Sequence, residues 1–349
     1  MSGFPAHPDD ITDDWWGAVL GRVPERWRWE PIGTGQVGDS VRFTLDFGDG
    51  AGPQTIAGKF AAADPTSRGT AAMLGLYTKE VRFYRDLAPQ LPVRTPKALF
   101  AEIADDGASF CLLFEDLAPA RGGNQIAGCS IADARAGIVQ AAALHAPSWH
   151  NRAILDADWL QPDPEAAAKV KALYPQAQAI FRERYAGVLE PEYMALCEAL
   201  AEHTATTDRV SEAISLVHGD FRLDNLLFDI KGGAEAIAVL DWQTLTIGNG
   251  LTDIGYFLGC GIGDALRRAH EGELLDLYCA EMTARGVPMS RDAIWRDYVV
   301  GALHGVSTAV FSAAFVVRTE RGDANFLSMA RGACALCLEH GSLDLMQKG

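Results

Sequence analysis

The chain has 349 residues, of which 48% are hydrophobic and 22% are charged, a balance typical of a globular protein with one large or two ordinary domains. Its formal net charge of −16 argues against a nucleic-acid partner, because binding a phosphate backbone requires a basic surface. Its seven scattered cysteines indicate reduced thiols rather than a disulfide framework, so we expect a reducing, cytoplasmic location.

No segment has the pattern expected of a targeting or membrane-spanning sequence. The N-terminal residues lack a basic region followed by an apolar core, so they predict no signal peptide. The most apolar stretch, residues 301–317, contains His304 and several small polar residues, and we interpret it as a buried helix. We therefore expect no membrane partner, and nothing in the sequence indicates a protein partner.

The first predicted elements are a short amphipathic helix over residues 8–20 and a glycine-rich hairpin. Residues 27–47 alternate as two strands around a G-x-G-x-x-G loop formed by Gly33, Gly35 and Gly38. A dinucleotide-binding loop of this pattern opens a helix, whereas the residues after Gly38 continue as a strand. The context therefore favours a loop that covers phosphates and argues against a Rossmann-type oxidoreductase.

The next segment predicts a third strand followed by a helix, and each carries one charged residue of interest. Residues 55–60 read TIAGKF and place Lys59 on the strand. Residues 67–87 have a helical pattern of apolar positions, and Glu80 lies within it. An exposed strand lysine and a solvated helix glutamate are the ordinary alternatives for these two residues.

Two further strands, residues 97–103 and 109–114, lead into a segment where the character of the chain changes. The second strand reads FCLLFEDL and brings the chain to Glu115 and Leu117. After it come a loop with proline and glycine and then mostly helical patterns. We therefore place a domain boundary between residues 115 and 116.

The strongest signal in the chain is a polar loop followed by a hairpin. The loop reads HGDFRLDN, so that Asp220 is followed by four residues and then Asn225. Two apolar runs around a Gly-Gly turn come next and predict a hairpin that ends at Asp241. The hairpin would return Asp241 to the loop, and two carboxylates with one amide suit a magnesium ion bound to a nucleotide.

The stretch HGDFRLDNLLFD, with IAVLDWQTLTIGNGLTDIGYF after it, resembles the aminoglycoside phosphotransferase and choline kinase superfamily, and within it the ecdysteroid-kinase-like branch. The resemblance is sharpest over residues 214–260. It assigns no role to Arg222 or Asp224, and it makes His145 and Asp253 structural. LDWQ replaces the DFG of protein kinases, and no activation segment can be identified, which argues against a protein substrate.

This resemblance implies an α+β, two-lobed protein-kinase-like fold. Residues 1–115 would form an N-terminal lobe with an antiparallel sheet and a helix, and residues 116–349 a larger, mainly helical C-terminal lobe. Asp220 would be the catalytic base, and Asn225 and Asp241 would hold Mg²⁺. The residues expected to contact or position ATP are Gly33, Gly35, Gly38, Lys59, Glu80, Glu115 and Leu117.

The sequence therefore predicts an ATP-dependent phosphotransferase that moves the γ-phosphoryl group to a hydroxyl of a small molecule. An amino sugar, a choline-like amine, a sterol-like alcohol and another metabolite all stay open as the acceptor. The alternative is a catalytically silent nucleotide-binding or scaffolding protein with the same fold. Against this alternative, Lys59, Asp220, Asn225 and Asp241 all have the residue types that catalysis needs.

Overall fold

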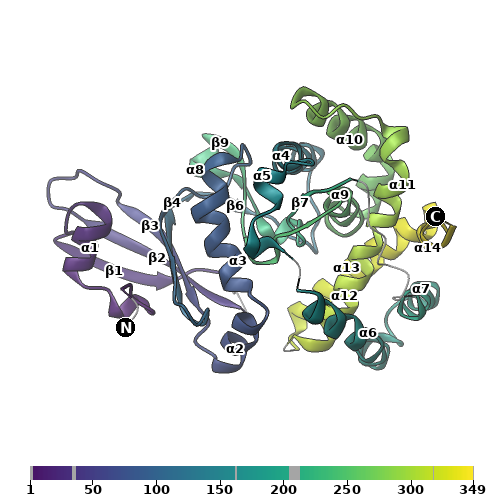
Figure 1. Ribbon diagram of the computed structural model, residues 1–349, viewed down its shortest axis with the longest axis horizontal. Helices are drawn as coiled ribbons and strands as arrows, with labels where there is room; N and C mark the ends of the chain where they lie inside the picture. The colour runs from purple at the N-terminus through teal and green to yellow at the C-terminus, as the bar shows by residue number, and fades with distance from the viewer. Residues whose placement is uncertain (1–2, 34–36, 162, 204–212, 317, 349) are drawn as a thin grey trace.

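The computed structural model describes residues 3–33, 37–161, 163–203, 213–316 and 318–348 (Figure 1). The N-terminal part is built on a sheet, and the C-terminal part is mainly helical, which confirms the predicted α+β class. In Figure 1 the sheet lies at one end of the molecule and the last helices lie at the other.

The N-terminal sheet has five antiparallel strands in the order β1-β2-β3-β5-β4. Its strands are β1 (Arg26–Pro31), β2 (Gly38–Asp46), β3 (Thr55–Ala61), β4 (Ala98–Ile103) and β5 (Phe110–Glu115). Alternation along β2 buries Val41, Phe43 and Leu45 on one face and leaves the other face half-exposed. The strands predicted from alternating apolar residues are therefore present.

Helices cover both faces of this sheet. Helix α1 (Asp13–Leu20) buries Trp16 against Phe43, with ring centroids 5.3 Å apart. On the opposite face lie α2 (Pro65–Met73) and α3 (Leu76–Arg82), and α3 continues as a π-helical turn over Phe83–Leu87. The apolar core on the α3 side runs on without a break into the C-terminal helices. The boundary predicted after residue 115 coincides with the end of β5, and as a domain boundary it stays a prediction.

The C-terminal part surrounds two small sheets with helices. The sheets contain β6 (Arg121–Gly122), β8 (Leu226–Asp229) and β9 (Glu235–Val239) in one, and β7 (Ser215–Val217) and β10 (Thr246–Gly248) in the other. The helices are α4 (Ile131–Ser148), α5 (Arg152–Leu155), α6 (Pro164–Tyr185), α7 (Pro191–Glu202), α8 (Ile230–Gly233), α9 (Leu251–Tyr256), α10 (Asp264–Ala284), α11 (Arg291–Gly301), α12 (Leu303–Phe315), α13 (Glu320–His340) and α14 (Ser342–Lys348).

The predicted hairpin before Asp241 is confirmed as the antiparallel pair β8–β9, in which Leu226 lies opposite Val239. Its turn needs left-handed backbone conformations, with φ of 71° at Gly232 and 87° at Gly233. The two glycines adopt these conformations without steric cost, so the strands can pair in a register that returns the chain to the loop before β8.

The most apolar helical stretch belongs to the interior of the helical part. Within the described residues, one helix, Arg291–Phe315, is long and apolar enough to cross a membrane by length and composition alone. However, 56% of its most apolar window is buried inside the structure. The inward side of α12 consists of small and branched residues such as Val306, Ala309 and Val310, which pack in the core. The buried helix predicted around residues 301–317 is therefore present up to Phe315.

Candidate active site

The first part of the candidate site is a partly buried lysine that contacts two carboxylates. Lys59 on β3 lies with its Nζ 2.7 Å from Oε1 of Glu80 and 3.1 Å from Oδ1 of Asp241. The Lys59 side chain is 16% exposed and that of Glu80 only 2%. Burial alone would lower the pKa of Lys59, but the negative charges of Asp241 and Glu80 outweigh it and raise the pKa above its ordinary range. The lysine is therefore held as a cation.

Aromatic packing explains how Glu80 and Asp241 come together. Phe83, just beyond α3, stacks on Trp242 with ring centroids 3.8 Å apart and an interplanar angle of 11°. This contact joins the helix that carries Glu80 to the residue after Asp241. Asp241 itself adopts a left-handed conformation with φ of 63°, which aspartate tolerates better than most residues.

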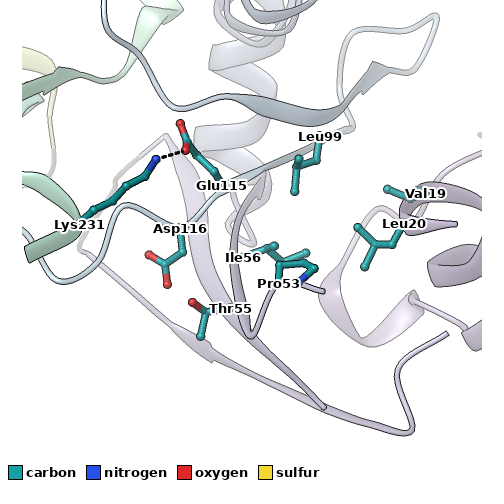
Figure 2. Close-up of a pocket in the computed structure, with 9 residues that line it drawn as sticks. All are labelled: Val19, Leu20, Pro53, Thr55, Ile56, Leu99, Glu115, Asp116 and Lys231. Carbon is teal, nitrogen blue, oxygen red and sulfur yellow. Dashed lines mark ion pairs between the residues drawn. The ribbon is translucent and has the colours of Figure 1, made fainter. Parts of the chain in front are cut away.

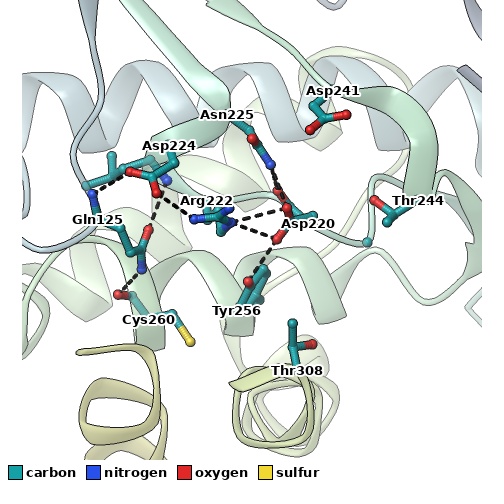
Figure 3. A network of polar contacts seen from close by, with 12 residues as sticks. Gln125, Asp220, Arg222, Asp224, Asn225, Asp241, Thr244, Tyr256, Cys260 and Thr308 are labelled. Carbon is teal, nitrogen blue, oxygen red and sulfur yellow. Dashed lines mark hydrogen bonds and ion pairs between the residues drawn. The ribbon is translucent and has the colours of Figure 1, made fainter. Parts of the chain in front are cut away.

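The second part of the site is the loop that holds Asp220 (Figure 3). Oδ2 of Asp220 accepts a hydrogen bond of 2.7 Å from Nδ2 of Asn225. Oδ1 accepts one of 2.9 Å from Nε of Arg222 and another of 2.9 Å from the hydroxyl of Tyr256. Burial and the charge of Asp220 raise the pKa of Tyr256, so its hydroxyl keeps the proton that it donates. Three side chains thus fix the orientation of the Asp220 carboxylate.

A backbone hydrogen bond brings the residue before Asp241 next to Asn225. The N–H of Leu240 donates to the carbonyl of Asn225 at 2.9 Å, which sets the start of the Asp241 turn next to the loop. Nδ2 of Asn225 also donates to the Asp220 carbonyl, at 2.8 Å, so Oδ1 is the amide atom left for a cation. In the part of the chain that the structure describes, no group of three or more His, Cys, Asp or Glu residues could hold a metal by itself.

A buried aspartate accepts hydrogen bonds from the backbone at the start of the HGD loop. Asp253 on α9 accepts hydrogen bonds from the N–H groups of His218, at 2.7 Å, and Gly219, at 3.0 Å. His145 lies 3.2 Å from the same carboxylate. Burial alone would raise the pKa of Asp253, but the hydrogen bond and charge of His145, with the charge and N–H of His218, lower it. These contacts agree with the structural roles expected for His145 and Asp253.

Gly219 is required by this arrangement for steric reasons. Its φ is 81°, and a Cβ at this position would lie 2.7 Å from the carbonyl oxygen of Thr244. The imidazole of His218 packs against Trp242 and places Nε2 2.9 Å from the carbonyl of Leu240. The first two residues of the HGD motif therefore shape the loop, and the third presents the carboxylate.

Several residues of this site could not be identified from the sequence. Arg222 connects two carboxylates, because its Nη1 lies 2.8 Å from Oδ2 of Asp224. Asp224 in turn accepts a hydrogen bond of 2.9 Å from the N–H of Gln125. Gln125 belongs to a segment in which the sequence offers no motif. Tyr256 lies within the stretch that carries the family resemblance, which is the one signal that could have pointed to it.

The glycine-rich loop is described only in part. Gly33 has φ of 77°, and Gly38 is the buried first residue of β2, where a Cβ would come within 3.0 Å of the Phe60 carbonyl. Gly35 lies outside the described residues. The hydroxyl of Tyr77 on α3 donates to the carbonyl of Val37 at 2.6 Å, so the helix that carries Glu80 also anchors the end of the loop.

The segment after β5 uses its polar groups to connect the two parts of the chain. The Glu115 carboxylate lies 2.7 Å from Nη1 of Arg94 and 2.7 Å from Nζ of Lys231. The Leu117 carbonyl accepts a hydrogen bond of 2.9 Å from the N–H of Lys231. The Glu115 side chain thus forms two ion pairs. The expected contact of Glu115 and Leu117 with ATP stays a prediction.

A cavity of about 520 Å³ lies next to this segment and not at Asp220 (Figure 2). Val19, Leu20 and Leu99 line its apolar end, and its polar end carries Glu115, Asp116 and Lys231. None of the residues of the HGD loop contributes to its wall. The cavity is therefore separate from the cluster around Asp220.

Comparisons with known proteins identify the family and the fold of this chain. The family model described as "Phosphotransferase enzyme family" matches residues 67–286. A stretch of 43 residues is 54% identical to acyl-CoA dehydrogenase family member 11 of Homo sapiens, and this match covers 12% of the chain and 5% of that protein. The chain thus spans only a small part of the length of these curated relatives.

Two solved structures share the fold over nearly the whole chain. One is a putative aminoglycoside phosphotransferase from Ralstonia eutropha, with a TM-score of 0.58, 17% identity and coverage of 94% of this chain and 97% of that one. The other is choline kinase from Cryptosporidium parvum, with a TM-score of 0.58, 10% identity and coverage of 92% and 90%. They confirm the kinase-like fold. The match to the family model confirms the predicted superfamily, whereas the ecdysteroid-kinase-like branch stays a prediction. Since the family model covers more than half of its length, the chain belongs to the phosphotransferase enzyme family.

Proposed function

We propose that this protein transfers the γ-phosphoryl group of ATP to a hydroxyl of a small-molecule acceptor. The observation that carries the proposal is the meeting of Lys59, Glu80 and Asp241, which come from a strand, a helix and a loop. Lys59 and Asp241 are 182 positions apart in the chain, yet their side chains are in contact. A lysine oriented by a glutamate, beside an aspartate at a strand end, is the arrangement that kinases use on nucleotide phosphates.

The donor atoms at the site suit a magnesium ion. Mg²⁺ prefers oxygen ligands and takes one or two from the protein, with the rest from phosphates and water. Asn225 would offer Oδ1, and Asp241 would offer its carboxylate, whose side chain is 30% exposed. When bound, the ion would neutralise the charge on the phosphate oxygens. Lys59 would contact the phosphates directly and would exchange Asp241 for them.

Asp220 would act on the acceptor. Its carboxylate would receive a hydrogen bond from the acceptor hydroxyl and orient it for in-line attack on the γ-phosphorus. The new bond joins the acceptor oxygen to phosphorus, and the bond that breaks joins phosphorus to the β,γ-bridging oxygen. The hydroxyl proton passes to Asp220 and then to solvent, and ADP leaves with the electron pair of the broken bond.

Calorimetric titration of ATP, with and without Mg²⁺, tests this proposal. The useful variant is Asp241→Asn, because asparagine accepts the left-handed backbone at this position while it removes the charge. We expect Mg²⁺-dependent binding to weaken by about tenfold or more, or roughly 1.4 kcal/mol. Asp156→Asn is the matched control, since the Asp156 carboxylate is exposed and forms an ion pair with Arg152.

The acceptor would then be sought among amino sugars, amino alcohols such as choline, and other metabolite alcohols, with product formation followed by phosphorus NMR. Folded wild-type protein that does not bind ATP with Mg²⁺ would overturn the proposal. Tight binding without transfer to any acceptor or to water would favour a catalytically silent nucleotide-binding protein.

A further inference from the structure

The HGD loop contains a chain of ion pairs, and two of its members, Arg222 and Asp224, have no part in the proposed mechanism. Arg222 is held between two carboxylates: its Nε lies 2.9 Å from Oδ1 of Asp220, and its Nη1 lies 2.8 Å from Oδ2 of Asp224 (Figure 3). The Arg222 side chain is 19% exposed, as is that of Asp224. A guanidinium that bonds through two different edges cannot rotate without breaking one of the two contacts.

Both oxygens of the Asp224 carboxylate interact with neighbouring groups. Its Oδ2 is engaged by Arg222, and its Oδ1 accepts the N–H of Gln125 at 2.9 Å. The carboxylate is therefore fixed from two sides, one in its own loop and one in a segment that lies 99 positions earlier in the chain. Asp224 therefore links Arg222 to the Gln125 segment.

Gln125 is itself held rigidly. It is 2% exposed, its Oε1 accepts the N–H of Leu223 at 3.2 Å, and its Nε2 donates to the carbonyl of Cys260. Two positions earlier, a Cβ on Gly123 would lie 2.0 Å from the carbonyl oxygen of Leu223, so the two backbones are in direct contact. The segment that contains Gly123 and Gln125 thus packs directly against the HGD loop.

We propose that Asp224 and Gln125 are positioning residues, which hold the guanidinium of Arg222 against Asp220 and thereby fix the direction of the catalytic carboxylate. This inference rests on the proposed function for the role of Asp220, whereas the chain of contacts exists independently of it. Rigidity of this kind matters because phosphoryl transfer depends chiefly on positioning, and a displacement of about 1 Å can cost about a hundredfold in rate.

The variant Asp224→Asn separates positioning from folding. Asparagine has the same shape and can still accept the Gln125 N–H, but its charge no longer attracts Arg222. Gln125→Leu is the second variant, because it removes both side-chain hydrogen bonds and leaves the backbone N–H that donates to Asp224. Asp156→Asn is the control, because Asp156 is an exposed carboxylate that forms an ion pair with Arg152. Thermal unfolding verifies that each variant is folded.

The first readout is NMR of the ¹⁵N-labelled full chain without nucleotide. The Nε–H of Arg222 and the Nδ2 amide of Asn225 both donate to Asp220, so their resonances report the direction of its carboxylate. We expect both to shift or broaden in Asp224→Asn and, less strongly, in Gln125→Leu, and to stay unchanged in Asp156→Asn. Resonances that coincide with those of the wild type in both site variants would overturn the proposal, whether or not the protein is an active kinase.

The second readout is ATP hydrolysis with water as the acceptor, followed by phosphate release. We expect kcat to fall about 10- to 100-fold in Asp224→Asn, with the KM for MgATP within about twofold of the wild type. Shifted resonances with unchanged kcat would also overturn the proposal. A wild type that neither binds nor hydrolyses ATP would instead refute the proposed function, and the NMR result would then decide the positioning on its own.

Discussion

Two chains of ion pairs between side chains meet at the candidate active site. One is long-range and the other is local in the sequence. In the first, Lys59 lies between Glu80 and Asp241, and its contact with Asp241 joins residues 182 positions apart. In the second, Arg222 lies between Asp220 and Asp224, each two positions away from it. Both chains place one partly buried cation between two carboxylates, but the first exists only when strand, helix and loop are packed together.

The difference indicates what each chain can do. The local chain depends on the geometry of the HGD loop and on the Gln125 segment, so it holds the Asp220 carboxylate in one orientation without any residue of the N-terminal sheet. The long-range chain contains groups that would both face phosphates, Lys59 directly and Asp241 through a cation. We infer that nucleotide binding rearranges the long-range chain and leaves the local one unchanged.

The largest effect should come from removing the charge at the end of the local chain. Asp220→Asn keeps an oxygen that can accept hydrogen bonds from Tyr256 and Arg222. Its amide nitrogen would replace the oxygen that accepts from Asn225, but Nδ2 of Asn225 can still donate to the backbone carbonyl of residue 220, so the loop should keep its shape. We expect turnover to fall by about a thousandfold or more, because the acceptor hydroxyl loses its carboxylate partner. The Kd for MgATP, measured by calorimetry, should stay within about threefold. Turnover near the wild-type value would show that Asp220 is not the base.

An intermediate effect should come from weakening the long-range chain. Glu80→Gln retains the size of a side chain that is 2% exposed, but of the two carboxylates that contact Lys59 it leaves only that of Asp241. Lys59 should then turn away from the phosphates, and we expect kcat/KM for ATP to fall about 10- to 100-fold. Steady-state kinetics with the best acceptor from the screen would measure this change. An equal loss in the Kd for ATP and in kcat/KM would place the effect on binding, and a loss in kcat alone would place it on the transfer step.

The same contrast explains what the sequence could predict. The spacing of Asp220, Asn225 and Asp241 was informative because a loop and a hairpin bring nearby residues together through local geometry. The sequence places Lys59 on a strand and Glu80 on a helix, and packing brings the two side chains into contact. Periodicity predicted the individual strands, whereas the antiparallel sheet and the mainly helical C-terminal lobe were implied by the family resemblance.

Contacts between distant segments could not be predicted. Nothing in the sequence around Gln125 indicates that its N–H meets Asp224, because this depends on how β6 runs beside β8. The ion pairs of Glu115 with Arg94 and Lys231 were missed for the same reason. Single-sequence patterns report which face of an element is buried, whereas these pairings are decided by the tertiary arrangement of charged residues on the other faces.

The smallest effect should come from a substitution beside a third cation, which lies outside the two chains of ion pairs and serves as a structural comparison for them. Arg267 on α10 is 0% exposed, and its guanidinium contacts Asp264 and Glu339 at 2.7 Å each. The hydrogen bond from Arg267, assisted by Arg268, lowers the pKa of Glu339 from the ordinary 4.5 to about 2. Because the folded-state pKa is the lower one, this carboxylate stabilises the protein fully above pH 4.5 and loses that contribution as the pH falls toward about 2.

Glu339→Gln should therefore lower the free energy of unfolding by no more than about 1 kcal/mol at pH 7, since the Glu339 side chain is 36% exposed and its ion pairs are screened. Urea unfolding at a series of pH values should show a shallower loss of stability between pH 4.5 and about 2 than in the wild type. The kcat and the Kd for MgATP should not change. An altered kcat in this variant would mean that turnover responds to any buried ion pair of the helical part, and the special roles given to the two chains at the site would then lose their support.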